Sequence, residues 1–287
     1  MTLTRRQATE LLEAHGAAPS RALGQNFVVD PNTVRRIARL AEVGPSDRVV
    51  EVGPGLGSLT RALVETGASV VALELDRFVL PILEQEVVPL GVRVVAGDAM
   101  TVDWTSLLQG LPHVLVANLP YNISVPLICD LLDQQPLISR MLVMVQKEVG
   151  ERLAGHPRTK AYGAVSVKVA YWGTARVVGL VPPTVFLPQP KVDSALVSIV
   201  RHQSPAVDPS VVSHAELFEL VQTGFGKRRK MLRGSLAGLV AADDFVAAGV
   251  APEARPEELD VLAWGRLAAA RRVRCGAVQQ PVSGPVH

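Results

Sequence analysis

A glycine-rich segment directly follows a short run of β-branched residues and has the composition of a ligand-binding loop. Residues 51–57 read Glu-Val-Gly-Pro-Gly-Leu-Gly, and a strand is predicted over 48–52. Glycine lets the backbone turn tightly and approach a bound molecule closely. A dinucleotide-binding fingerprint would place a further glycine where this chain has Ser58. The segment therefore favours a cofactor site without a pyrophosphate cradle, and an ordinary glycine-rich turn is the alternative.

Carboxylates end the next two predicted strands. Glu74 ends the second strand and could accept hydrogen bonds from both hydroxyls of a ribose, and Asp98 ends the third and could accept one from an exocyclic amine. Either acid alone could be merely solvated, which is what we expect of Asp76. Because three consecutive strands bring a glycine loop and two acids to one edge of a sheet, the pattern favours a binding site there.

The fourth predicted strand ends in the tetrapeptide Asn118–Tyr121, Asn-Leu-Pro-Tyr. An aromatic amine is a poor nucleophile, because its lone pair is delocalised into the ring, so an enzyme that alkylates it must hold the nitrogen while it rehybridises. The Asn118 oxygen and the backbone carbonyl of Leu119 or Pro120 could accept its two N–H groups, while Tyr121 stacks on the ring. Pro120 also fixes the direction of the loop. The alternative is a turn with Tyr121 in the core.

The elements that position these residues alternate between β-branched runs and helical patterns from residue 30 to about 150, which is typical of a parallel sheet covered by helices. One helix begins with Asp30 as N-cap and ends at Gly44. Two later β-rich segments, 164–171 and 194–200, would complete an α/β sheet of about seven strands. The five earlier strands are expected at 48–52, up to 75, at 92–97, at 113–117 and at 141–145.

The pattern changes near residue 205. Residues 203–210 have turn composition and predict a linker, and the segments 211–223, 228–241 and 256–271 have apolar residues at helical spacing. We therefore expect three parts, and the last of them to be disordered. They are a catalytic, cofactor-binding domain over 1–205, a small all-α domain over 206–275 and a tail over 276–287.

Composition excludes several classes of protein. The chain has 29 Lys and Arg against 27 Asp and Glu, so any nucleic-acid-binding surface must be local. Its two cysteines are far apart and its six histidines show no ligand spacing, so we expect neither a disulfide framework nor a metal site. Glu10 and Glu13 interrupt any signal peptide, and prolines interrupt the longest uncharged stretch, 104–129. We expect a soluble, cytoplasmic protein, monomeric and without membrane association.

A basic cluster in the small domain would suit contact with phosphates. It lies at the start of the helix predicted over 228–241, where the helix dipole disfavours positive charge, so a ligand or partner is expected there. A solvated basic face is the alternative. The cluster comprises Lys227, Arg228, Arg229, Lys230 and Arg233, and the residues that could extend it are Arg152, Arg158 and Lys160.

Taken together, these motifs resemble the ribosomal RNA adenine N6,N6-dimethyltransferases over about residues 20–235. The number and order of the motifs make the resemblance specific. It is closest to the bacterial small-subunit enzymes, which use S-adenosylmethionine to dimethylate two adjacent adenosines in a hairpin loop near the 3′ end of 16S rRNA in the 30S particle. The matching segments are 25–30, 51–57, 74–77, 97–99, 118–124 and 186–194.

The resemblance implies a Rossmann-like class I methyltransferase fold, no metal, and a role for individual residues. Asn118 would contact both donor and target, and Pro120 and Tyr121 would complete the catalytic base site. Phe186 would form the other face of a stacking sandwich, with a place in the core as the alternative. The positions that would contact the donor are Asn26, Val28, where leucine is more usual, Gly53, Glu74, Asp98 and Asn118.

Other functions remain open from the sequence alone. A 23S rRNA adenine methylase of the macrolide-resistance type would share the donor loop and the Asn-Leu-Pro-Tyr region, and methylases of DNA adenine or protein glutamine can also use such a segment. A non-catalytic RNA-binding or ribosome assembly factor could keep the fold and the basic helices. A nicotinamide oxidoreductase is disfavoured by Ser58.

Overall fold

The computed structural model describes residues 2–278, which divide into two compact units. The first unit is Met1–Ala154 with Thr174–Arg201, and the second is Gly155–Gly173 with His202–His287. These units differ from the predicted domains 1–205 and 206–275 chiefly in Gly155–Gly173, which groups with the second unit. Of the tail predicted over 276–287, residues 279–287 lie outside the described residues, and the first three residues belong to a helix that ends at Val278.

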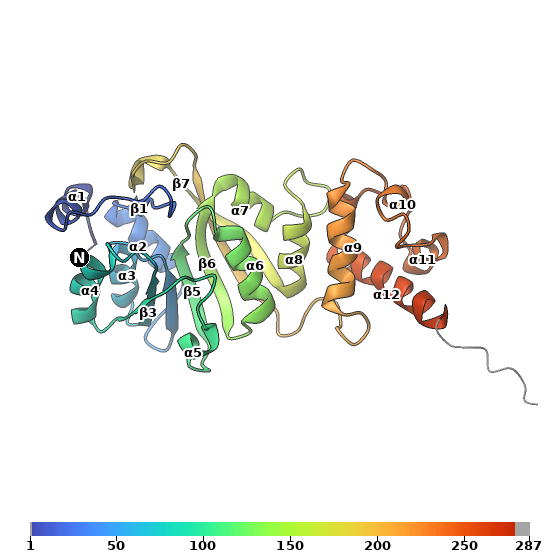
Figure 1. Cartoon of the computed structure of the whole chain (residues 1–287), viewed down its shortest axis with the longest axis horizontal. Coiled ribbons are helices and arrows are strands. Elements are labelled where there is room, and N and C mark those ends of the chain that lie inside the picture. The colour runs from blue at the N-terminus through green and yellow to red at the C-terminus, as the bar shows by residue number, and fades with distance from the viewer. Residues whose placement is uncertain (1, 279–287) are drawn as a thin grey trace, which may run out of the picture. The chain divides into compact units, whose positions relative to one another are not determined.

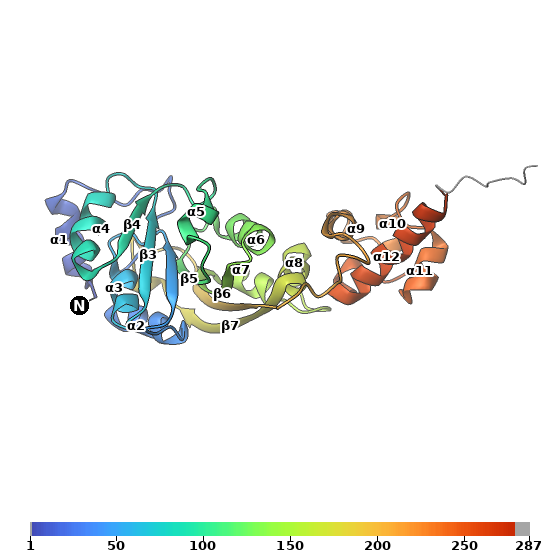
Figure 2. The same ribbon diagram turned by 90° about the horizontal axis from the view of Figure 1, so that it is seen from below.

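A seven-stranded sheet forms the centre of the first unit (Figures 1 and 2). Its order is β4-β3-β2-β5-β6-β9-β7; β2 to β6 are parallel, and β9 runs antiparallel to β6. The predicted α/β class with about seven strands is confirmed. The strands are β2 (Arg48–Val52), β3 (Ser69–Glu74), β4 (Arg93–Ala96), β5 (His113–Asn118), β6 (Ile138–Gln146), β7 (Gly173–Val181) and β9 (Ser194–Arg201).

The strand predicted over 164–171 is wrong, because Ala164–Trp172 forms the helix α8 and the seventh strand is β7. Alternating valines in this segment suggested a strand. Val167 and Tyr171, one helical turn apart, are instead both buried in the apolar cluster of the second unit. Packing on that cluster overrides the weak strand preference of valine.

The strand order reverses between β2 and β5. The chain passes from β2 to β3 and β4 in one direction, and from β5 to β6 in the other. A crevice opens at such a switch point beyond the carboxyl ends of the strands, and ligands of open α/β sheets bind there. The glycine loop and the Asn-Leu-Pro-Tyr segment follow the two strands that flank this crevice.

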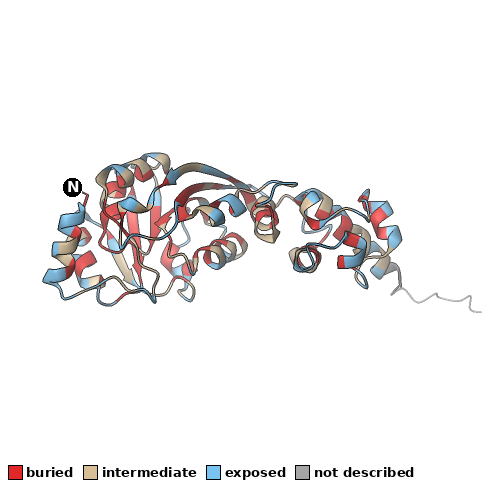
Figure 3. Cartoon of the chain, turned by 90° about the horizontal axis from the view of Figure 1, so that it is seen from above, coloured by how far each residue is buried: buried red, intermediate tan, exposed pale blue. Residues whose placement is uncertain are grey.

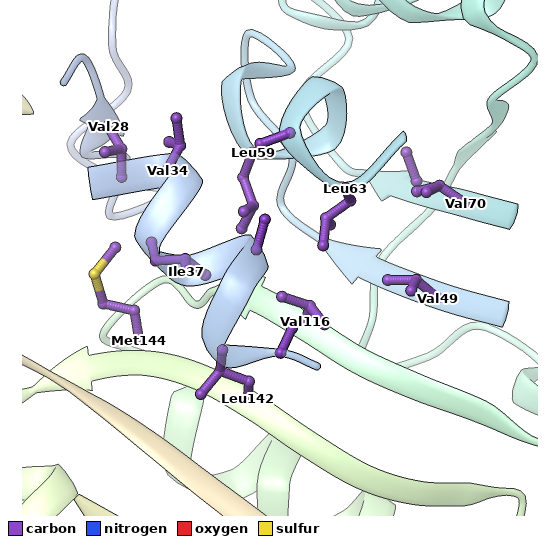
Figure 4. Packing of buried hydrophobic residues seen from close by; sticks show 14 of the residues in the cluster. Val28, Val34, Ile37, Val49, Leu59, Leu63, Val70, Val116, Leu142 and Met144 are labelled. Atoms are coloured by element: carbon purple, nitrogen blue, oxygen red, sulfur yellow. The ribbon is translucent and has the colours of Figure 1, made fainter. Parts of the chain in front are cut away.

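Helices α2 (Pro31–Leu40) and α3 (Ser58–Val64) cover one face of the sheet (Figure 4). The fully buried Val34 of α2 and Leu63 of α3 pack in one cluster with side chains from β2 and β5. As predicted, Asp30 caps α2, and its carboxylate accepts a hydrogen bond of 2.8 Å from the Thr33 backbone amide. This packing fixes the strand ends from which the candidate site is built. The strands at the centre of this unit are largely buried (Figure 3).

The opposite face is covered by α7 (Lys147–Leu153), with α6 (Ser124–Gln134) nearby (Figure 1). A Cβ at Gly150 would lie 2.8 Å from that of Ala195, so only glycine lets α7 pack this closely on β9. The remaining elements of this unit are α1 (Arg5–Ala14), β1 (Phe27–Val28), α4 (Leu80–Val87), α5 (Trp104–Leu108), β8 (Phe186–Leu187) and the short 3-10 helices Val88–Leu90 and Pro183–Val185.

The second unit is helical and packs around the fully buried Trp264. A Cβ at Gly224 would lie 2.6 Å from the indole, which explains the glycine there. Among the described residues, no helix is both long and apolar enough to cross a bilayer. The unit contains α8, α9 (His214–Gly226), α10 (Leu232–Ser235), α11 (Ala242–Ala248), a 3-10 helix (Pro256–Glu258) and α12 (Val261–Val278).

The helices predicted at 211–223 and 256–271 are confirmed in substance as α9 and α12, whereas the one predicted over 228–241 is wrong. That segment holds a turn, the single-turn α10 and a second turn. Its backbone amides bond across to another loop, since Leu232 N donates to the Ala254 carbonyl and Arg233 N to that of Pro252. These tertiary hydrogen bonds replace those of a continuous helix.

Candidate functional site

A pocket lies at the carboxyl ends of the strands on either side of the switch point. Eight of the nine residues that the family resemblance assigns to donor and target line it together, although they come from five separate stretches of the chain. These eight are Asn26, Val28, Gly53, Glu74, Asp98, Asn118, Pro120 and Tyr121.

The glycine loop forms the floor of the pocket beyond β2. Gly53 and Gly55 have φ angles of +67° and +56°, in the left-handed region that L side chains rarely adopt. A Cβ at Gly55 would also lie 2.6 Å from the Phe27 ring. The loop therefore needs glycine both for its own conformation and for the N-terminal segment to pack against it.

Glu74 ties the end of β3 to this loop. Its carboxylate accepts hydrogen bonds from the backbone amides of Gly55 at 3.0 Å, Leu75 at 2.9 Å and Asp76 at 2.8 Å. Burial raises the pKa of Glu74, while these three hydrogen bonds act in the opposite direction. The carboxylate is held in one orientation at the pocket wall, which suits an acceptor for a diol.

Asp98 lies beyond β4, further along the same edge. One carboxylate oxygen accepts a 2.8 Å hydrogen bond from the Met100 amide, and the other makes no hydrogen bond with the described residues. Leu75, Ala99 and Met100 also line the pocket and supply apolar surface. An acceptor beside an apolar wall matches a flat heteroaromatic ring that carries an exocyclic amine.

Asn118 ends β5, and its side chain has a defined orientation. Its amide nitrogen donates a 2.8 Å hydrogen bond to the Asn26 backbone carbonyl, an oxygen that can only accept. The nitrogen and oxygen of Asn118 are thereby distinguished, and the oxygen, which makes no hydrogen bond with the described residues, is available as an acceptor in a residue that lines the pocket. The N-terminal segment thus orients the residue that sequence analysis places at the reaction centre.

Pro120 and Tyr121 follow in the loop after β5. The Pro120 ring lies against Gly53, where a Cβ would be 3.6 Å from Pro120 Cδ. The Tyr121 hydroxyl lies 2.8 Å from Ser194 Oγ. Burial raises the pKa of Tyr121, so the phenol is neutral at physiological pH.

Phe186 is the predicted site residue that the structure does not bring to the pocket. It pairs with Val28 between the short strands β1 and β8, and its side chain is fully buried in the main hydrophobic cluster. It is absent from the described residues that line the pocket. The structure therefore places Phe186 in the core, which was the alternative to a stacking role.

Glu51, the last-but-one residue of β2, is a pocket residue that the sequence motifs do not indicate. It lines the pocket, is 1% exposed, and its Oε2 makes no hydrogen bond within the described chain. Burial raises the pKa of Glu51 to about 8, and the nearby Glu74 acts in the same direction. Within strand 48–52, Glu51 is the one charged residue among buried valines. A charge inside this apolar run was the sequence feature that could have indicated a functional residue.

The expectation that Asp76 is solvated is wrong. Asp76 is 6% exposed, and it accepts a 2.8 Å hydrogen bond from the Gln25 side chain and another from the Phe78 amide. Gln25 lines the pocket. Asp76 therefore anchors the N-terminal segment beside the pocket, a long-range contact with no local sequence signal.

The basic cluster does not begin a helix. Lys227 is the C-cap of α9, and the residues up to Lys230 form the turn that follows it. The C-terminal end of a helix favours positive charge, so the prediction that the helix dipole requires a ligand at this cluster is wrong. Within the second unit, Arg228 donates to the Lys160 carbonyl and pairs with Glu257, which sets the loop that contains Arg158 beside this turn. Arg152 belongs to the first unit and pairs with Glu148.

Comparison with known proteins agrees with this geometry. The family model described as "Ribosomal RNA adenine dimethylase" matches residues 18–269. The chain belongs to the ribosomal RNA adenine dimethylase family. A protein of Cutibacterium acnes named ribosomal RNA small subunit methyltransferase A is 48% identical over 260 residues, with 86% of each chain covered. A protein of the same name from Kineococcus radiotolerans is 43% identical, with 99% of this chain and 96% of the relative covered.

Solved structures extend the likeness to the fold. A dimethyladenosine transferase from Plasmodium falciparum matches with a TM-score of 0.71 at 25% identity, over 83% of this chain and 94% of that one. The 23S rRNA methyltransferase ErmE matches with a TM-score of 0.68 at 26% identity, over 86% and 100%. The chain is accordingly an rRNA methyltransferase with the Rossmann-like fold of enzymes that use S-adenosylmethionine.

The pocket fits that methyl donor by its own features. Glycines at left-handed φ bring the backbone close to a ligand, an oriented carboxylate beyond β3 suits a ribose, and an unengaged carboxylate oxygen beyond β4 suits an adenine amine. Together with the apolar wall, these features match the adenosine part of the donor.

Proposed function

We propose that this protein transfers methyl groups from S-adenosylmethionine to the N6 amines of two adjacent adenosines, in the hairpin loop near the 3′ end of 16S rRNA within the 30S particle. The observation that carries the proposal is the position of Asn118, which lines the same pocket as the proposed donor-binding residues and whose side-chain nitrogen is held by the Asn26 carbonyl. The names of the relatives favour the small subunit over 23S rRNA as the substrate.

The positions of the pocket residues support the donor roles that the family resemblance implies. Glu74 would hold the ribose hydroxyls, and Asp98 would accept from the adenine amine. Gly53 would lie against the amino-acid portion, and Asn26 and Val28 would close the pocket from the N-terminal side. The bound sulfonium supplies a methyl carbon with a good leaving group.

The chain itself has to position the target amine. The Asn118 oxygen and a carbonyl from the Leu119–Pro120 segment would accept its two N–H groups and so draw the lone pair out of conjugation. Tyr121 would stack on the base. Transfer would form an N–C bond and break the S–C bond of the donor, and the amine would release one proton to solvent. Catalysis by this chain then consists of alignment and electrostatics.

The turn after α9 would supply part of the grip on RNA. Lys227, Arg229 and Lys230 are exposed, and Lys160 lies in the neighbouring loop of the same unit. A loop and a turn held side by side by Arg228 present positive charge from two segments of chain, which suits contact with the phosphate backbone.

Since residues of this one chain line the pocket, we propose that the protein acts as a monomer, in the cytoplasm where 30S particles form. Light scattering coupled to size-exclusion chromatography tests the oligomeric state: a mass near 30.6 kDa supports a monomer, and about twice that mass contradicts it.

Transfer of radiolabelled methyl groups to 30S particles that lack the modification tests the main proposal. We expect dimethyladenosine at two adjacent positions of 16S rRNA, mapped by nuclease digestion and mass spectrometry. Label in 23S rRNA instead would favour the macrolide-resistance type of enzyme. Donor binding without transfer to any rRNA would favour an assembly factor, and both outcomes contradict the proposal.

A further inference from the structure

The hydrogen bond between Tyr121 and Ser194 is not needed for Tyr121 to stack on the target base. Their hydroxyl oxygens lie 2.8 Å apart, and Ser194 is fully buried. Stacking on a base requires only the aromatic ring, which phenylalanine would provide equally well. The hydroxyl of Tyr121 must therefore be explained by its hydrogen-bond partner.

Ser194 is fixed in place by the sheet. It begins β9, where it pairs with Gln146 at the end of β6, and β6 in turn pairs with β5. The backbone carbonyl of the preceding residue, Asp193, accepts a 2.9 Å hydrogen bond from the Lys147 backbone amide. Because β9 runs antiparallel to β6, its first residue lies at the edge where β5 and β6 end. A rigid hydroxyl thus faces a tyrosine on a loop.

We propose that Ser194 is a positioning residue, which holds the ring of Tyr121 at the tilt that places the target amine on Asn118. Without this hydrogen bond the ring is free to tilt about its side-chain torsions while it still stacks. This inference deepens the proposed function of the pocket and rests on it.

The second methyl transfer is the more sensitive one. An unmethylated amine has two N–H groups, and either can point to the Asn118 oxygen. After the first transfer only one N–H remains, so only one rotamer of the amine is productive, and the added methyl group narrows the tolerance for ring tilt. Loss of the hydrogen bond should slow the second transfer more than the first.

Single-turnover methylation of 30S particles by Ser194→Ala, Tyr121→Phe and the double variant tests this role. Monomethyladenosine and dimethyladenosine are resolved over time. We expect each single variant to slow the second transfer about 10-fold and the first less, because small misplacements of reacting groups are costly. The double variant should be no slower than either single variant, and donor affinity should be unchanged.

Two controls separate positioning from general damage. Ser235 is also fully buried, but among the described residues its hydroxyl bonds only to the Leu232 carbonyl in its own turn, so Ser235→Ala should leave the product ratio unchanged. Ser194→Thr keeps the hydroxyl and should restore the ratio. Thermal unfolding of every variant gives the folded fraction.

Additive effects of Ser194→Ala and Tyr121→Phe, or equal slowing of both transfers, would overturn the positioning role while the proposed function stands. Absence of dimethyladenosine with the unmodified protein would overturn both. Accumulation of monomethyladenosine in the single and double variants alike would support the inference.

Discussion

At the scale of the residue, the side chain of Asn118 is oriented before any substrate arrives, because its nitrogen is engaged by the Asn26 carbonyl. We expect Asn118→Ala to lower the methylation rate about 100-fold or more, the range seen when one preorganised hydrogen-bonding group is lost from a reaction centre. The exposed Asn32 on α2 gives a matched control, and Asn32→Ala should retain full activity. Radiolabel transfer measures both, and a similar loss in the two variants would argue against the assigned role.

A second residue-scale prediction concerns Glu51 and pH. Burial raises the pKa of Glu51 from 4.5 to about 8, so the folded protein keeps this proton over a range where the unfolded chain has released it. The folded state then binds more protons, and this group makes the free energy of unfolding fall as pH rises between these values. Glu51→Gln should remove that part of the slope in urea unfolding from about pH 5 to about pH 8. The exposed Glu84→Gln should leave it intact, and an unchanged slope in Glu51→Gln would contradict the assignment.

At the scale of the element, the glycine loop follows β2 and contacts both the end of β3 and the N-terminal segment. Gly55→Ala would place a Cβ against the Phe27 ring at a positive φ, which should lower the free energy of unfolding by about 1–3 kcal/mol. It should also weaken donor binding in calorimetry. Gly44 has open space around it and an ordinary φ, so Gly44→Ala should change neither property by much. Equal stability of the two variants would show that the loop tolerates a side chain.

Local patterns predicted the elements that carry the site, but not the contacts that join distant segments. The strand-end positions of Glu74, Asp98 and Asn118 follow from periodicity, because parallel strands end at one edge. The helix α8 was mistaken for a strand, since its valines alternate and only packing in the second unit decides between the two. The pairing of β1 with β8, which draws Phe186 into the core, joins segments that no local pattern relates.

At the scale of the whole molecule, positive and negative charges nearly cancel, so RNA affinity should depend on local basic surfaces. The turn after α9 is one such surface. Replacing Lys227, Arg229 and Lys230 by alanine should weaken RNA binding and lower the slope of log affinity against log salt by about 2–3. Donor binding should be unchanged. Alanine at three exposed arginines of the other unit, Arg6, Arg35 and Arg39, is the charge-matched control. A larger effect in the control would place the RNA elsewhere.

The second unit is built from two stretches of chain, Gly155–Gly173 and His202–His287, between which β7 and β9 return to the sheet. During synthesis α8 therefore leaves the ribosome well before α9 and α12, the helices against which Val167 and Tyr171 are buried. Until those helices are made, Val167 and Tyr171 lack the partners with which they pack in the complete unit. The first unit, whose final strand ends at Arg201, can complete its sheet earlier. During synthesis the donor pocket in the first unit can therefore form before the helical unit completes its apolar core.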